Sequence, residues 1–237
     1  MELSAERIAA ALDRPELPVY VYDLLDSTNE ECRRRLSAGQ RQCLVLARAQ
    51  SGGKGRSGKQ FFSPAGGLYM SLALPMGGDA AALTCRAAVA TAEAIEAVTG
   101  IDCGIKWVND LYVRGKKVCG ILAEAVGDAV ILGIGVNLVS QPLPEELQGT
   151  VGFLDCGDAR EALAVEVTTR LLAPEADFME RYRQRSLVLG RELLCRCGDR
   201  EFTARALAID DQGGLVVEGP AGRETLRFGQ VSIRGIF

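Results

Sequence analysis

Residues 103 to 136 alternate short apolar runs with turn signals, and no other part of this 237-residue chain constrains the fold as strongly. The runs are Ile105 to Trp107, Leu111 to Val113, Lys117 to Ala125 and Ala129 to Val136. The dipeptides Arg114-Gly115 and Gly127-Asp128 stand where hairpin turns are expected. This region therefore predicts a meandering, largely antiparallel sheet.

The rest of the chain predicts helices around this meander and a second, smaller unit after it. Helices are expected over residues 4–12, 28–38, 80–99 and 159–185. Ser4 is expected to cap the first helix, and a side chain of Ser27-Thr-Asn-Glu30 is expected to cap the second. The third helix follows Asp79, which gives it an acidic N-terminus. Further strands are expected at 19–25, 42–49 and 68–74. After Gly190 the chain changes to segments of about six residues, the last at 231–237, separated by glycine-containing turns, which is typical of a small β-barrel. The predicted class is α+β, with a mixed, mainly antiparallel sheet flanked by helices in residues 1–188 and a barrel in 189–237.

Composition excludes several classes of function. The formal net charge of −4 argues against broad nonspecific binding to nucleic acid. No apolar run approaches the ~20 residues that span a bilayer, and the N-terminus lacks the features of a secretory signal, so we expect no membrane association and a cytoplasmic location. The eight cysteines are scattered without a Cys-x-x-Cys pair, as in reduced proteins. The absence of histidine removes Ser-His-Asp and Cys-His catalysis.

Two segments carry the residues that chemistry without histidine would use. Gln50 to Lys59 is a glycine-rich turn with three cations, a composition suited to phosphate, although such a turn alone is more often a solvated connection. In the second segment, Lys106 to Glu124, the single Trp lies between Lys106 and the pair Asn109-Asp110. A return strand with Lys117 follows, and so many polar neighbours are hard to explain by a core tryptophan alone.

These segments resemble the biotin protein ligases. The family's Gly-Arg-Gly-Arg-x-Gly-Arg loop corresponds to residues 53–59, its Lys-Trp-Pro-Asn-Asp-Leu to 106–111, and its Lys-x-x-Gly-Ile-Leu-x-Glu to 117–124. Ser27-Thr-Asn29, Gln50 and Gly133-Ile-Gly-Val-Asn137 fall in family order. The resemblance implies a fold like that of class II aminoacyl-tRNA synthetases, with an SH3-like C-terminal domain. About 17 residues precede the first predicted strand, too few for the winged-helix repressor domain of some members, so a monofunctional form without DNA binding is expected.

The resemblance also implies the reaction and its participants. Biotin and ATP would give biotinyl-5′-AMP and pyrophosphate with Mg²⁺, and a lysine of a biotin carboxyl carrier protein would then displace AMP. The implied catalytic residues are Lys117, Arg56 and Asp110. The implied biotin site is Ser27, Thr28, Gln50, Gly53, Arg56, Lys117, Gly120 and Gly135. The implied ATP site is Lys54, Arg56, Lys59, Phe61, Asn109, Lys117 and Asn137.

The sequence leaves open the role of Asp110, the effect of four substitutions in the motifs, and the choice between related functions. Asp110 could accept a proton from the target lysine, or it could hold Mg²⁺ with Asn109. In the second case the ATP phosphates would complete the metal site, because no metal site made by protein side chains alone is expected. Lys54, Lys59, Phe61 and Val108 depart from the family's usual Arg, Arg, Trp and Pro. A lipoate or octanoate ligase is the nearest rival, but its usual signature includes a histidine. A noncatalytic biotin-binding regulator could lose Lys117 or Arg56, and a sheet edge could pair with a second copy or with the carrier.

Overall fold

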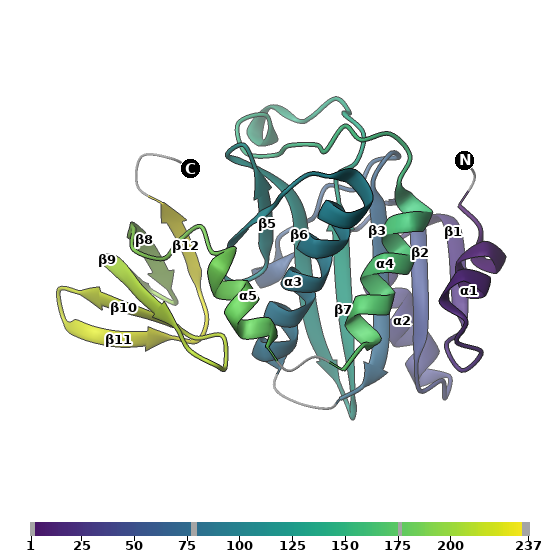
Figure 1. Cartoon of the computed structure of the whole chain (residues 1–237), viewed down its shortest axis with the longest axis horizontal. Coiled ribbons are helices and arrows are strands. Elements are labelled where there is room, and N and C mark those ends of the chain that lie inside the picture. Colours follow the sequence, from purple (N-terminus) through teal and green to yellow (C-terminus); the bar gives the residue numbers. More distant parts are fainter. Residues whose placement is uncertain (1–2, 77–79, 175–176, 234–237) are drawn as a thin grey trace.

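A seven-stranded mixed sheet forms the centre of the larger part of the molecule (Figure 1). The computed structural model describes residues 3–76, 80–174 and 177–233. The strands are β1 (Val19–Leu25), β2 (Cys43–Gln50), β3 (Leu68–Pro75), β4 (Gly104–Lys106), β5 (Asp110–Val113), β6 (Lys116–Val126) and β7 (Ala129–Val136), in the order β1-β2-β3-β7-β6-β5-β4. Only β1 and β2 pair in parallel. The predicted meander, and the mixed, mainly antiparallel sheet, are confirmed.

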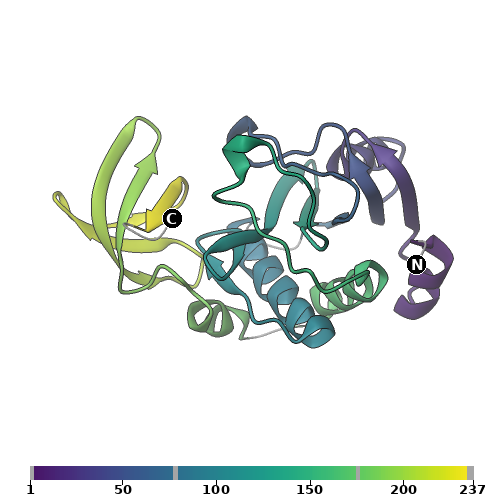
Figure 2. The same ribbon diagram turned by 90° about the horizontal axis from the view of Figure 1, so that it is seen from above.

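Helices cover both faces of this sheet. They are α1 (Ala5–Leu12), α2 (Thr28–Ser37), α3 (Ala80–Thr99), α4 (Arg160–Leu172) and α5 (Phe178–Gln184). Helices α3 and α4 lie on one face and α2 on the other, as the two views in Figures 1 and 2 agree. Alternate residues of β2 therefore enter different apolar clusters: Leu44 packs with the α3 side, and Val45 packs with Cys32 of α2.

Two local predictions were wrong. The single helix expected over 159–185 is two helices, because Pro174 follows α4 and cannot donate the backbone hydrogen bond that would continue it. Ser27 occupies the N-cap position of α2 but makes no capping hydrogen bond with its side chain. The Ser4 cap is confirmed, since its Oγ accepts a hydrogen bond from the Arg7 backbone N–H at 3.3 Å.

The chain after α5 folds into a five-stranded antiparallel sheet. Its strands are β8 (Glu192–Cys197), β9 (Arg200–Ile209), β10 (Leu215–Gly219), β11 (Gly222–Leu226) and β12 (Gln230–Ile233), in the order β11-β10-β9-β8-β12. The pairing of β12 with β8 places the last strand beside the first. Asp79 and the end of the strand predicted at 231–237 lie outside the described residues. The domain boundary between residues 188 and 189 stays a prediction.

A buried hydrogen bond joins the two parts. The indole N–H of Trp107, between β4 and β5, donates to the carbonyl of Gly213 at 2.8 Å. Trp107 is only 5 % exposed, so this bond forms away from water. No helix in the described part of the chain is both long and apolar enough to cross a membrane.

Candidate active site

A pocket of about 300 Å³ opens where the loop after β2, the start of α2, strands β6 and β7, and strand β12 meet. Most of the predicted site residues line it: Ser27, Thr28, Gln50, Lys54, Arg56, Lys59, Phe61, Asn109, Asp110, Lys117, Gly120 and Gly135. The glycine-rich loop and the Lys106–Glu124 segment therefore line one pocket.

Two cations of the loop reach across the pocket mouth. The Arg56 guanidinium donates to Asn109 Oδ1 at 3.1 Å and to the Gly229 carbonyl at 3.3 Å. Lys59 Nζ donates to Gln230 Oε1 at 3.1 Å. Because Gly229 and Gln230 belong to the C-terminal sheet and its approach, that part of the chain contributes directly to the wall of the site.

Two oppositely charged residues that line the pocket form an ion pair. Lys117 Nζ is 2.6 Å from Asp110 Oδ1, and both side chains are about three-quarters buried. Lys106 lies close by, and its pKa is lowered because burial penalises its charge, while Asp110 opposes this shift and Lys117 adds to it. The pocket thus gathers positive charge around one carboxylate, an arrangement that favours an anionic ligand.

Phe61 forms an apolar wall over two glycines that face each other on β6 and β7. A Cβ at Gly135 would lie 2.5 Å from the Phe61 ring, and one at Gly120 would lie 2.8 Å from it. Only glycine leaves room for the ring here. Lys117 Nζ lies 5.8 Å from the ring centroid, so the same aromatic side chain borders the cationic centre.

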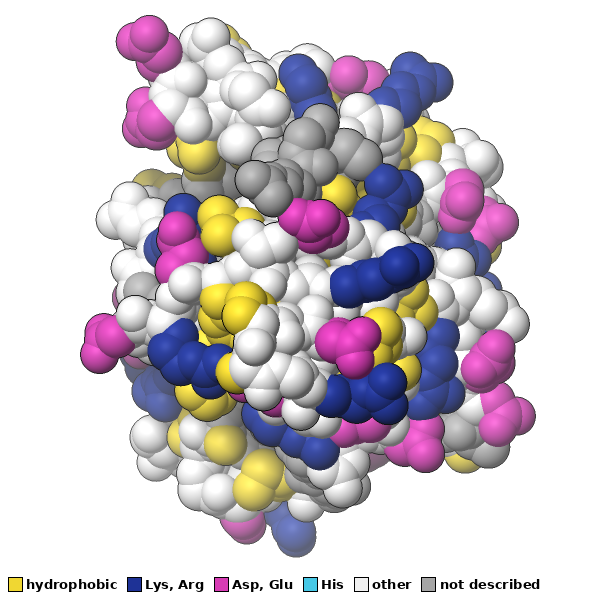
Figure 3. Space-filling view, turned by 90° about the vertical axis from the view of Figure 1, so that its left-hand side faces the viewer, with side chains coloured by type: hydrophobic (Ala, Val, Ile, Leu, Met, Phe, Trp, Pro, Cys, Tyr) yellow, Lys and Arg dark blue, Asp and Glu magenta, His cyan; other side chains and the backbone are white. Residues whose placement is uncertain are grey.

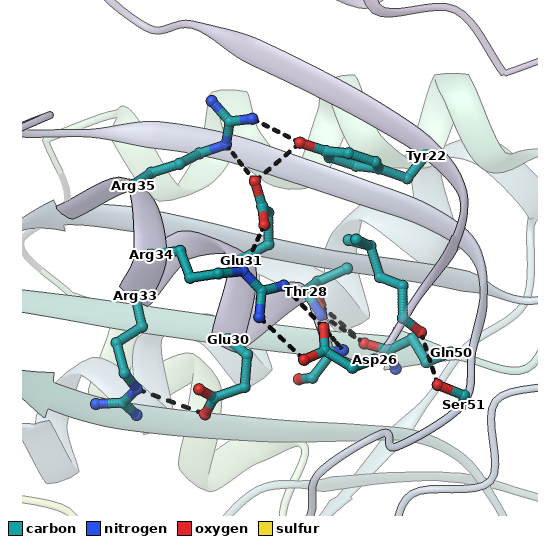
Figure 4. Close-up of polar contacts among 12 residues, drawn as sticks. Tyr22, Asp26, Thr28, Glu30, Glu31, Arg33, Arg34, Arg35, Gln50 and Ser51 are labelled. Atoms are coloured by element: carbon teal, nitrogen blue, oxygen red, sulfur yellow. Dashed lines mark hydrogen bonds and ion pairs between the residues drawn. The ribbon is translucent and has the colours of Figure 1, made fainter. Parts of the chain in front are cut away.

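Hydrogen bonds fix the polar end of the pocket. Gln50 Oε1 accepts from the backbone N–H of Thr28 at 2.8 Å, and Gln50 Nε2 donates to Ser63 Oγ at 2.9 Å. Figure 4 shows Thr28 and Gln50 approaching each other from α2 and β2, beside the ion pairs Arg34–Asp26 and Arg35–Glu31. Ser27 is 2 % exposed and lines the pocket without capping α2.

Two predicted residues lie outside this pocket. A Cβ at Gly53 would approach the Phe61 carbonyl to 2.4 Å, so Gly53 lets the loop pack against itself. Asn137 is buried and donates to the Gly152 carbonyl at 3.1 Å, while its backbone N–H donates to Val118. Asn137 therefore supports the strand that carries Lys117 rather than lining the cavity.

The structure adds residues that sequence reasoning did not assign. Asn29, Lys106, Gly133, Gly229 and Gln230 all line the pocket. The first three stand inside motifs quoted above, so their position was a usable signal. Gly229 and Gln230 carry no local signal, because only tertiary contact brings them to the loop. Among the described residues, no group of three or more His, Cys, Asp or Glu side chains could hold a metal ion.

Comparisons with known proteins agree with this geometry. Residues 21–138 match the Biotin/lipoate A/B protein ligase family, and residues 189–234 match the Biotin protein ligase C terminal domain. The biotin–[acetyl-CoA-carboxylase] ligase of Paracoccus denitrificans is 34% identical, over 89% of this chain and 98% of its own length. The bifunctional ligase/repressor BirA of Escherichia coli is 29% identical, over 98% of this chain and 78% of its own length.

A solved structure has the same fold. Biotin protein ligase from Aquifex aeolicus, in complex with biotin and ATP, superposes with a TM-score of 0.78 and 28% identity, over 91% of this chain and 98% of that one. Fold, pocket and comparisons define a ligase that joins a small carboxylic acid to protein. The chain belongs to the biotin protein ligase family.

Proposed function

We propose that this protein uses ATP to activate biotin as biotinyl-5′-AMP and then transfers biotin to a lysine of a biotin carboxyl carrier protein. The observation that carries the proposal is the convergence of Arg56, Lys59 and Lys117 on one pocket that also has an apolar wall and a buried polar end. ATP and the biotin carboxylate are both anions, and fixed cations stabilise them most strongly in a site that excludes water.

In the first half-reaction a carboxylate oxygen of biotin attacks the α-phosphorus of ATP. The new bond joins carboxylate and phosphorus, and the bond to the β-phosphate oxygen breaks to release pyrophosphate. Lys117 bridges the carboxylate and the α-phosphate, and Arg56 clamps the phosphate and the carbonyl of the intermediate. Asn109 holds that guanidinium, because its oxygen accepts from Arg56 and its amide nitrogen donates to the Ile121 carbonyl at 2.7 Å.

The remaining assignments divide the pocket between the two substrates. Ser27, Thr28, Gln50 and the glycines beside Phe61 receive biotin. Lys54 and Lys59 hold ATP phosphates, and Gly53 and Asn137 support the loop and the strand that carry the main cations. Mg²⁺ would be held mainly by the ATP phosphates, near Asn109, and it would neutralise phosphate charge.

In the second half-reaction the amine of the carrier lysine attacks the acyl carbon, and AMP leaves. A lysine with a pKa near 10.4 titrates about 3.4 pK units above pH 7, so removing its proton at pH 7 costs roughly 4–5 kcal/mol. Asp110 is the carboxylate in the pocket that can orient this amine and accept its proton.

One assay tests the whole proposal. The protein is incubated with ATP, Mg²⁺, biotin and a biotin carboxyl carrier domain, and the carrier is analysed by intact mass. We expect the mass of one biotin on the carrier, formed only when both ATP and biotin are present. Lipoate or octanoate in place of biotin tests the rival ligase. A protein that binds biotin but releases no biotin-dependent pyrophosphate would be the noncatalytic regulator.

Location and assembly belong to the same proposal. The eight cysteines are free thiols, which supports a reducing compartment such as the cytoplasm.

We expect that this chain does not bind DNA. Its net charge of −4 supports this, and basic and acidic side chains intermingle on the face in Figure 3. The outer strand β1, with Leu24 63 % exposed, is the sheet edge that a homodimer would use, and light scattering tests this.

A further inference from the structure

A turn of three residues, Trp107 to Asn109, joins β4 to β5 at the edge of the pocket, and we call it the β4–β5 turn. Lys106 and Asp110 pair with each other across its two ends. Lys106, Asn109 and Asp110 all line the pocket. A change in the backbone of this short turn would therefore move the amide and the carboxylate that the proposed mechanism uses.

Hydrogen bonds to other elements hold both ends of the β4–β5 turn. The Trp107 indole donates to the Gly213 carbonyl in the C-terminal part of the chain at 2.8 Å. Asn109 is held on β6, because its side-chain amide donates to the Ile121 carbonyl at 2.7 Å and its own carbonyl accepts from the Ile121 N–H at 3.0 Å. The first and last residues of the turn are thus tied to two different sheets.

Tyr182 of α5 holds the middle residue of the turn. Its phenolic O–H donates to the Val108 carbonyl at 3.0 Å. The Tyr182 side chain is completely buried, and burial raises the pKa of its phenol well above the usual value. The hydroxyl therefore keeps its proton and can donate this bond. Val108 directly precedes the pair Asn109-Asp110, so the bond fixes the backbone from which these two side chains extend.

The two neighbours of Tyr182 anchor α5 on opposite sides. Arg181 Nη1 donates to Glu93 of α3 at 2.9 Å, and Arg183 Nε donates to the Ile209 carbonyl of β9 at 2.8 Å. Figure 1 shows α5 where the chain passes from the larger part of the molecule to the C-terminal sheet. Tyr182 thus reaches the turn from a helix that is itself held on both sides, which suits a residue that fixes the position of another.

We propose that Tyr182 is a positioning residue for the transfer step: through the Val108 carbonyl it sets where Asp110 presents its carboxylate to the target lysine. This inference rests on the proposed function, in which Asp110 orients that amine and accepts its proton. Tyr182 does not line the pocket and acts only through the turn. Transfer depends on this role more than adenylation does. It must align an amine, a carboxylate and an acyl carbon, whereas Arg56 and Lys117 stabilise adenylation from elements outside the turn.

Tyr182→Phe tests the proposal because it removes only the hydroxyl. The kcat for transfer from preformed biotinyl-5′-AMP to a biotin carboxyl carrier domain, followed by intact mass, should fall by about tenfold. The KM for the carrier and the Kd for biotin should change by less than about twofold, since α2 and β2 form the polar end of the pocket. Tyr22→Phe is the matched control, because it removes a phenol hydroxyl that donates to Glu31 outside the pocket at 2.8 Å. It should leave kcat unchanged, and thermal unfolding checks the fold of both variants.

A double variant distinguishes positioning from a merely structural role. If Tyr182 acts through Asp110, Tyr182→Phe should lower transfer by less than about twofold in a protein that already carries Asp110→Asn. The same tenfold loss in both backgrounds would show that the hydroxyl acts independently of Asp110, and the inference would be wrong. Unchanged transfer by Tyr182→Phe in an active parent would overturn the inference alone. A parent protein that transfers no biotin would contradict the proposed function and, with it, this inference.

Discussion

Lys117 and Asp110 face each other because of an irregularity in the pairing of β5 with β6. Asp110 pairs with Gly120 and Leu111 with Cys119, but Tyr112 pairs with Lys117, so Val118 is an extra residue. Without this bulge Lys117 would point to the opposite face of the sheet from Asp110. The bulge brings the Lys117 ammonium to 2.6 Å from the Asp110 carboxylate and places both in the pocket.

Asp110→Asn should separate the two half-reactions. The amide keeps the size of the side chain but cannot accept the proton of the target lysine, so transfer to the carrier should fall by on the order of 100-fold. Biotin-dependent pyrophosphate release should fall less than about tenfold, because the cations remain. Both steps are measured separately, and Asp102→Asn, an exposed carboxylate outside the pocket, is the control. Equal losses in both steps would indicate that Asp110 holds Mg²⁺ instead.

Lys117→Ala should abolish adenylation while the fold persists. Removal of a charge-stabilising donor costs about 10²–10³ in rate, and Lys117 serves both reacting anions, so pyrophosphate release should fall by at least that factor. Lys116 is the neighbouring exposed lysine and does not line the pocket, which makes Lys116→Ala the matched control. Circular dichroism checks the fold. Near-normal pyrophosphate release by the Lys117 variant would remove this residue from the mechanism.

Gly135→Ala should force the Phe61 ring out of its place. The new Cβ would lie 2.5 Å from the ring, and overpacking of this kind costs about 1–3 kcal/mol in the free energy of unfolding. Adding Phe61→Leu should restore part of that loss because a shorter side chain leaves room. Gly149→Ala, where no atom lies within 4 Å of the new Cβ, is the control. Denaturant unfolding measures all four proteins, and a double variant no more stable than Gly135→Ala would argue against the contact.

The sequence predicted much of this site because its main parts are local in the chain. The cationic loop and the segment containing Lys117 each form one turn or hairpin, so spacing and composition were enough to mark them. The β5–β6 bulge was not visible, because alternation in a short strand does not reveal one extra residue. Gly229 and Gln230 were missed for a different reason, since they reach the loop only after two separately folded sheets meet.

The capping error at Ser27 has a similar origin. A serine before a helix usually caps it, but the pattern cannot show that a pocket forms beside the same residue. The split of the helix predicted over 159–185 was predictable in principle, because Pro174 was visible in the sequence. The hydrogen bonds of Asn29 to Ser71 and Glu124 were not predictable, because these two residues come from strands far from α2 in the chain.

Lys106→Met should stabilise the protein in a pH-dependent way. Burial lowers the pKa of Lys106 below its usual 10.5. Between the pKa of the folded state and 10.5, the unfolded chain therefore binds more protons than the folded protein does. In this range the free energy of unfolding rises with pH. Below that range both states carry the proton and the whole cost of burying the charge is present. Methionine removes the cost, so the variant should melt at a higher temperature than the parent at neutral pH. The difference should shrink as the pH approaches 10.5. Thermal unfolding followed by circular dichroism across this range checks the trend, with exposed Lys116→Met as the control. A gain that stays constant with pH would show that packing, rather than charge burial, causes it.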